Sequence, residues 1–209
     1  MLIEWSPYHL SYPHLLEYQG ALYCGPEACY SRSVKLFALD AKASNVLESR
    51  VVFSGFASVD PTIFEHEGRW WLFCTNAERN ESNSALYAFH AESPFGPWEP
   101  HAANPIVKDS GAARPAGKVM RMDGRLYRPA QDCSVRYGGG LKMFTITKLT
   151  PTEFTQDLVW ALNPPVGERG KHGVHTINTA DGHTIYDAYT ERLSPLAWLH
   201  RLRERFRRN

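Results

Sequence analysis

The sequence predicts an all-β protein, more closely a β-propeller, and two observations support this prediction. First, a hairpin motif recurs four times, and its turn glycines lie 48, 56 and 58 residues apart, at Gly20, Gly68, Gly124 and Gly182. Second, further short β-rich runs lie between these hairpins, at 34–39, 85–90 and 141–146. A period near 50 residues with about four short strands is typical of a propeller blade. The alternative is a β-sandwich whose hairpins resemble one another by accident.

The four repeats share one pattern: apolar residues, a two-residue turn, and then an aromatic-rich strand. They cover residues 11–28, 59–77, 115–132 and, more weakly, 173–189. Asp123-Gly124 and Asp181-Gly182 are suited to a type I′ turn, in which both central residues need φ > 0. Each repeat is therefore expected to form one hairpin of a separate blade.

The C-terminal end has a different pattern. Leu199, Leu202 and Phe206 recur at helical spacing, and from Glu191 onward six arginines accompany two acidic residues. We therefore expect a propeller domain over residues 1–190 and a short basic amphipathic helix over 191–209. Such a helix packs on the propeller or frays in solvent, or it contacts an anionic surface.

Composition excludes several classes of protein. With 43% hydrophobic and 22% charged residues and a net charge of +1, the chain is neither disordered nor a strongly basic nucleic-acid binder. No apolar stretch approaches the length of a transmembrane helix. The N-terminus resembles no secretion signal, and the four cysteines form no CxxC pair. These features predict a cytoplasmic protein without a structural zinc site.

Several strings resemble blade motifs of the furanosidase-type propellers, glycoside hydrolase families 43 and 32. They are VDPTIFEHEG at 59–68, followed by WWLF at 70–73, and SPFGPW at 93–98, followed by NPI at 104–106. A narrower resemblance is to the propeller at the N-terminus of glucosamine inositolphosphorylceramide transferase-like proteins. It is carried by HLSYP at 9–13, CGPE at 24–27, ARPAG at 113–117 and YRPAQDC at 127–133. The resemblance covers roughly residues 5–190, and RPAQD is its most specific part.

This resemblance implies a five-bladed propeller with a central pocket. Four repeats are visible, so the chain is expected to lack the family's first blade, which carries the general base. Asp60 matches the family's auxiliary aspartate, which tunes the pKa of the general acid. The general acid's EGP string has no match, because Arg114-Pro115-Ala116 stands in its place. A complete hydrolase triad is therefore not carried over.

Candidate site residues follow from the convergence of inner strands on a propeller's central channel. Glycoside hydrolysis needs a carboxylic acid and a carboxylate facing each other, so Glu27 is the candidate acid and Asp60 or Asp132 the candidate base or orienting group. Polar and aromatic side chains at the same positions can bind sugar hydroxyls or a phosphate. The expected substrate-binding residues are Tyr12, His14, Arg114, Arg128, Gln131 and His175.

Structural roles are the alternative for several of these residues. Asp60 precedes a proline, and an aspartate there often caps a turn through its own backbone. Arg114 and Arg128 could instead form salt bridges with Asp60 or Asp132. His172 and His175 lack a third ligand nearby in the sequence, so no metal is expected.

The sequence thus predicts a carbohydrate-active propeller, either a glycosidase or a glycosyl-transfer-related enzyme acting in the central channel. The alternatives are a non-catalytic module that binds a glycan or nucleotide sugar, and an inactive truncated relative. The expected ligand is a carbohydrate or sugar phosphate, with no cofactor and no nucleic acid. A homodimer is a further expectation, since an open blade edge can pair with a second copy.

Overall fold

The computed structural model describes residues 8–163, 171–180 and 182–191, and nearly all of its regular structure is β. The first repeat forms a four-stranded antiparallel sheet. Its strands are β1 (Ser11–Tyr18), β2 (Ala21–Glu27), β3 (Ser33–Leu39) and β4 (Val46–Ser54), with a 3₁₀ turn, η1 (Cys29–Ser31), between β2 and β3. The predicted C-terminal helix lies outside the described residues.

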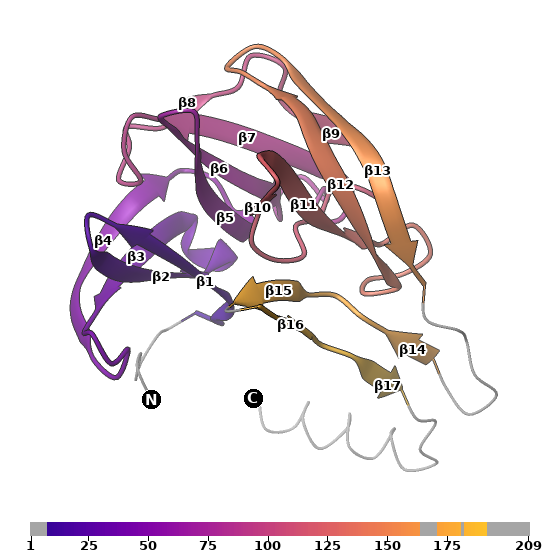
Figure 1. Cartoon of the computed structure of the whole chain (residues 1–209), viewed down its shortest axis with the longest axis horizontal. Coiled ribbons are helices and arrows are strands. Elements are labelled where there is room, and N and C mark those ends of the chain that lie inside the picture. Colours follow the sequence, from indigo (N-terminus) through magenta and orange to yellow (C-terminus); the bar gives the residue numbers. More distant parts are fainter. Residues whose placement is uncertain (1–7, 164–170, 181, 192–209) are drawn as a thin grey trace.

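The second and third repeats form sheets of the same kind. The second sheet contains β5 (Ser58–His66), β6 (Arg69–Asn76), β7 (Ala85–Ala91) and two short outer strands, β8 (Glu99–Pro100) and β9 (Val107–Lys108). The third contains β10 (Met120–Met122), β11 (Arg125–Asp132), β12 (Gly140–Leu149) and β13 (Phe154–Leu162). In Figure 1 the sheets follow one another around the molecule, with β1, β5 and β10 toward the middle.

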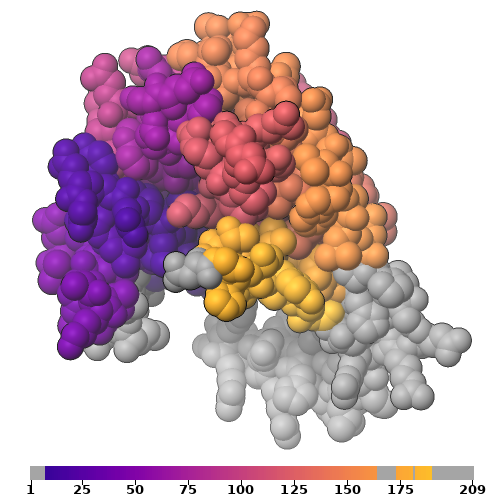
Figure 2. All heavy atoms as spheres, in the orientation of Figure 1, coloured from indigo at the N-terminus to yellow at the C-terminus, as the bar shows by residue number. Residues whose placement is uncertain are grey.

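The fourth repeat forms a long two-part hairpin. Its two pairs are β14 (Lys171–Gly173) with β17 (Tyr189–Glu191), and β15 (Ile177–Ala180) with β16 (His183–Tyr186). The hairpin is hydrogen-bonded to the segment before β10, because the Ile177 amide donates to the Ala116 carbonyl at 2.7 Å. Space-filling atoms of this hairpin lie against both the first and third sheets in Figure 2.

The turns have the backbone conformation that the sequence predicts. At Gln19-Gly20, Glu67-Gly68 and Asp123-Gly124 both central residues have positive φ, as a type I′ turn requires. These tight turns fix the register of each inner hairpin. The prediction of an all-β propeller is confirmed.

The core lies between the sheets. Leu16 and Leu36 of the first sheet pack on Ile63 and Leu72 of the second. On the other side of the second sheet, residues of β6 and β7 pack on β11 and β12; they include Trp71, Phe73, Leu86, Leu126 and Ile146. Because the second sheet is covered on both faces, all seven residues of β7 are buried. Burial of each large apolar side chain stabilises the fold by about 1.5–3 kcal/mol.

Candidate functional site

The site begins with two equivalent irregularities in the inner strands. Tyr12 of β1 and Asp60 of β5 have φ of 47° and 50°, and each precedes a proline. The pairing register of each strand shifts at this point. Left-handed backbone is unfavourable for side-chain-bearing residues and marks positions that the surrounding structure holds in place. Here the Tyr12 hydroxyl reaches across to Thr62 of the neighbouring sheet at 2.9 Å.

Asp60 is the centre of a buried polar group, called here the Asp60 cluster: Glu27, Asp60, Arg114 and Gln131. Arg114 Nε donates to Asp60 Oδ2 at 2.7 Å, and Gln131 Nε2 donates to the same oxygen at 3.3 Å. The Asp60 backbone N–H donates to Glu27 Oε2 at 2.9 Å. All three sheets therefore contribute to the cluster, since Glu27 ends β2, Asp60 lies in β5 and Gln131 lies in β11.

Burial dominates the electrostatics of this cluster. Asp60 is 4% exposed, and burial raises the pKa of its carboxyl above the ordinary value. The Arg114 guanidinium lowers that pKa, and the Glu27 carboxylate raises it again. Burial lowers the pKa of Arg114, but Asp60, Tyr137 and Glu27 together raise it by more, so the net shift is upward. The cluster thus contains two carboxyl groups and one cation in a site from which water is largely excluded.

Tyr137 lies beside the cluster, on the loop between β11 and β12. The Arg114 guanidinium stacks over the Tyr137 ring at 4.7 Å, and Tyr137 as a whole remains 49% exposed. The His175 ring follows at 5.4 Å from the Tyr137 ring, and it pairs with Asp187 of the fourth repeat. Tyr137 is not among the site residues predicted from the sequence; its one local signal is its position directly before a run of three glycines.

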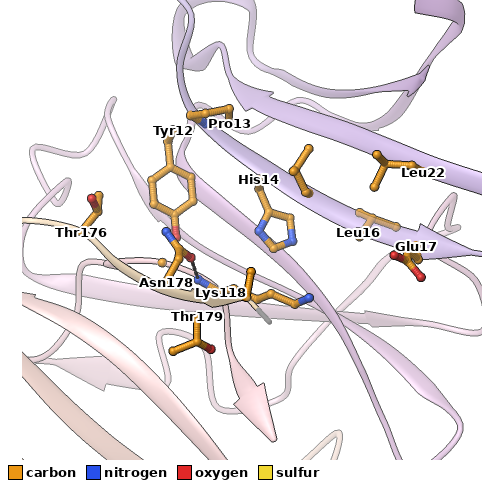
Figure 3. A pocket seen from close by; sticks show the side chains of 13 residues that line it. Tyr12, Pro13, His14, Leu16, Glu17, Leu22, Lys118, Thr176, Asn178 and Thr179 are labelled. Atoms are coloured by element: carbon orange, nitrogen blue, oxygen red, sulfur yellow. Dashed lines mark hydrogen bonds between the residues drawn. The ribbon is translucent and has the colours of Figure 1, made fainter. Parts of the chain in front are cut away.

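A cavity of about 580 Å³ adjoins β1, called here the β1 groove. Figure 3 shows its polar side chains, which come from β1, from the segment before β10, and from the fourth repeat. Its lining residues of greatest chemical interest are Tyr12, His14, Glu17, Lys118, Thr176 and Asn178. A pocket with mixed polar and apolar walls is typical of a site for a small ligand or a sugar.

His14 connects the groove to the neighbouring sheet. Its Nε2 atom lies 2.7 Å from the Ile63 carbonyl oxygen and 3.1 Å from the Ile63 backbone nitrogen, so the ring can hydrogen-bond the backbone of β5 in either tautomer. Burial lowers the pKa of His14 to about 4, so the ring is neutral at physiological pH. His14 thus holds β1 against β5 and gives the groove an uncharged wall.

Two of the expected site residues lie apart from the Asp60 cluster. Arg128 is buried between the second and third sheets, where its Nε donates to Gln156 at 3.0 Å and its guanidinium stacks over Phe144. Asp132 pairs with Lys142 at 2.9 Å. Although burial raises the pKa of Asp132, hydrogen bonds from Ser134 and Lys142 produce a net lowering.

No group of three or more histidine, cysteine or acidic side chains among the described residues is arranged to hold a metal ion. The four cysteines are free thiols. The part of the chain that is described contains no helix of the length and apolarity needed to cross a membrane.

Successive antiparallel sheets of four, five and four strands, arranged around a centre, define a β-propeller fold. Comparisons with solved structures agree at the level of the fold. An α-L-arabinofuranosidase from Clostridium thermocellum matches with a TM-score of 0.54 and 12% identity, over 88% of this chain and 70% of that one. An α-L-arabinofuranosidase from Lactobacillus brevis matches with a TM-score of 0.56 and 13% identity, over 81% and 60%.

Within this class, residues 3–197 match the family model described as "Glucosamine inositolphosphorylceramide transferase 1, N-terminal". The chain belongs to this family. Proteins named glucosamine inositolphosphorylceramide transferase 1 are 34% identical to it, over 158 residues in Oryza sativa subsp. japonica and 154 residues in Arabidopsis thaliana. These matches cover 71% of this chain, which spans about a fifth of the length of either relative, since 20% of each is covered.

Proposed function

We propose that this chain is a carbohydrate-recognition propeller that binds a glycan or sugar phosphate in the β1 groove without turning it over. The observation that carries the proposal is the ion pair between Asp60 and Arg114. Inverting hydrolysis requires two carboxyl groups about 6.5–9.5 Å apart with water between them. In the Asp60 cluster one carboxylate is bound by a guanidinium, and Glu27 accepts the Asp60 backbone N–H.

The groove supplies what recognition requires. It combines hydroxyl, amide and charged side chains with the apolar surface of Leu15, Leu16 and Leu22. Sugars present hydroxyl groups around their edges and C–H groups on their faces, so mixed walls of this kind suit them. The furanosidase-like fold and the transferases among the relatives both agree with a carbohydrate ligand.

A glycosidase is the second candidate, and the raised pKa of Asp60 favours it. A buried carboxyl that keeps its proton near neutral pH can act as a general acid. That role would require a ligand to displace Arg114 from Asp60. The two functions therefore differ in whether the Asp60 cluster opens when the ligand binds.

A thermal-shift screen of the full chain against neutral oligosaccharides, acidic oligosaccharides, sugar phosphates and nucleotide sugars tests the proposal, with reducing-sugar release measured in parallel. We expect stabilisation by at least one sugar class, retained in Asp60→Asn, and no released sugar. Leu15→Trp should block binding because Leu15 lines the groove and is 48% exposed. Leu47→Trp is the matched control, since Leu47 is 67% exposed on β4 and lies outside the groove.

Two results would overturn the recognition proposal. If the wild-type protein releases sugar and the Asp60→Asn variant does not, the chain is a glycosidase. If no saccharide stabilises the chain, or if Leu47→Trp abolishes binding as completely as Leu15→Trp, then the β1 groove is not a saccharide site.

A further inference from the structure

We propose that the β1 groove selects an extended saccharide bearing an anionic group, and that Lys118 is the residue that binds the anion. This inference rests on the proposed function and specifies its ligand class. It begins from the shape of the cavity. A second cavity of about 500 Å³ lies toward the turn end of the inner strands, between β1, β5 and β10. Both cavities are lined by Leu16, Glu17, Lys118 and Thr179, so they meet at these residues.

The two adjoining cavities, taken end to end, are longer than a single sugar ring. From Tyr12 to Glu17, β1 extends ~17 Å at about 3.3 Å per residue, and the second cavity continues beyond Glu17 to Trp70 and Met122. Trp70 is half-buried and stacks edge-on against Tyr18, so its indole lies in a fixed orientation at the far end. An aromatic ring in that place can pack against the face of a sugar. These dimensions favour an oligosaccharide over a monosaccharide.

Lys118 lies where the two cavities meet, and its backbone is fixed. Its N–H donates to Asn178 Oδ1 at 2.9 Å, and the preceding Gly117 packs so closely on Ile177 that no side chain would fit. In Figure 3 the Lys118 side chain extends along the pocket beneath His14. Its ammonium makes no salt bridge with any residue that the structure describes.

The charges around Lys118 leave it available to a ligand. His14 beside it is neutral, because burial and the Lys118 charge both lower the pKa of its ring. Glu17 is the one carboxylate that lines both cavities, and it does not pair with Lys118. At the far end, Glu65 accepts a hydrogen bond from the Gly68 backbone, and Arg121 bonds His66. Among the described residues that line the β1 groove, Lys118 is the one lysine or arginine, so a carboxylate or phosphate bound there would find its cation at Lys118 and a repelling charge at Glu17.

Isothermal titration calorimetry of the full chain tests the proposed ligand class and the role of Lys118. Three probes are used: trigalacturonic acid, its carboxyl-reduced neutral counterpart, and inorganic phosphate. We expect the acidic trisaccharide to bind more tightly than the neutral one, and phosphate to bind weakly. Lys118→Gln should weaken binding of the acidic probe about fivefold or more, as loss of one charged hydrogen bond implies, and should leave the neutral probe unchanged. Glu17→Gln should strengthen binding of the acidic probe by removing a repelling charge.

The control variant is Lys42→Gln, since Lys42 is exposed on the loop between β3 and β4, outside both cavities. Equal affinity for the acidic and neutral probes, or equal losses in Lys118→Gln and Lys42→Gln, would overturn the assignment of Lys118 while leaving saccharide recognition intact. Phosphate binding as tight as the acidic trisaccharide would show that Lys118 binds small anions and would overturn the extended-ligand assignment. If neither saccharide binds and the wider panel also fails, the proposed function itself is wrong.

Discussion

Replacing Arg114 with Met should destabilise the protein strongly at pH 8 and much less at pH 5. The two side chains of the Arg114–Asp60 pair are 13% and 6% exposed, and the joining atoms are 2.7 Å apart. Breaking a buried pair by removing one partner costs about 3–5 kcal/mol, because the remaining charge is left without compensation. We expect a loss of about 3–4 kcal/mol in the free energy of unfolding at pH 8.

The pH dependence follows from the Asp60 carboxyl. Its pKa in the folded protein is raised by burial and lowered by Arg114, so removing Arg114 raises it further. A carboxyl with a raised pKa in the folded state binds its proton more tightly there than in the unfolded chain. Its stabilising contribution is full below the unfolded pKa, near 4, and is lost as pH rises through the folded value. At pH 5 the variant's Asp60 is protonated, and we expect a loss of about 1–2 kcal/mol.

Urea unfolding followed by tryptophan fluorescence at pH 5 and pH 8 measures the free energy of unfolding at each pH. Glu78→Gln is the control, since the Arg32–Glu78 pair is 50% and 43% exposed and should contribute about 0–1 kcal/mol. The double variant Arg114→Met with Asp60→Asn should recover most of the loss and remove its pH dependence. An equal loss at both pH values, or a loss at pH 8 no larger than that of Glu78→Gln, would refute the reasoning.

Three further substitutions test the framework around the site. His14→Gln should remove part of the pH dependence of the free energy of unfolding. The pKa of His14 is lowered to about 4 in the folded protein, so about 3 kcal/mol of stability is present above pH 6.5 and is lost as pH falls toward 4. Acid unfolding that is identical in wild type and variant would contradict this. Gly117→Ala should destabilise by about 2 kcal/mol or more, because a Cβ would collide with the Ile177 carbonyl, and thermal unfolding should show a lower Tm. Gly124→Ala should cost only about 1 kcal/mol, since its φ is +73° but no atom obstructs a Cβ; a larger loss than that of Gly117→Ala would reverse the argument.

The repeat architecture could be predicted because its signal is local. A two-residue turn with glycine in second place has one favoured backbone conformation, so three such turns locate three inner hairpins without any knowledge of tertiary contacts. The convergence of Glu27 and Asp60 also followed from this alignment. Glu27 ends the second strand of one hairpin and Asp60 lies near the start of the first strand of the next, so both lie at the end of their hairpin that is opposite the turn.

The position of Arg128 shows where that alignment was insufficient. Side chains alternate between the two faces of a strand, so Arg128 shares a face with Leu126 and Ala130, which pack toward the second sheet. Gln131, three residues on, points to the opposite face and reaches Asp60. One strand therefore cannot direct both residues into the same site. Lys118, the proposed anion-binding residue, was not selected for another reason: its backbone is held by Asn178 of the fourth repeat, which is a long-range contact.

Three X-Pro pairs at the start of the inner repeats explain how one fold places a tyrosine, an aspartate and an arginine near one another. Tyr12, Asp60 and Arg114 each precede a proline, which disfavours helical backbone and keeps the strand start extended or bulged. The repeated backbone thus brings three different side chains toward the same region. Because the carboxylate and the guanidinium meet there, their charges compensate each other, and Tyr12 is left to line the groove. The proposed recognition in the groove and the ion pair of the Asp60 cluster therefore both depend on one structural repeat.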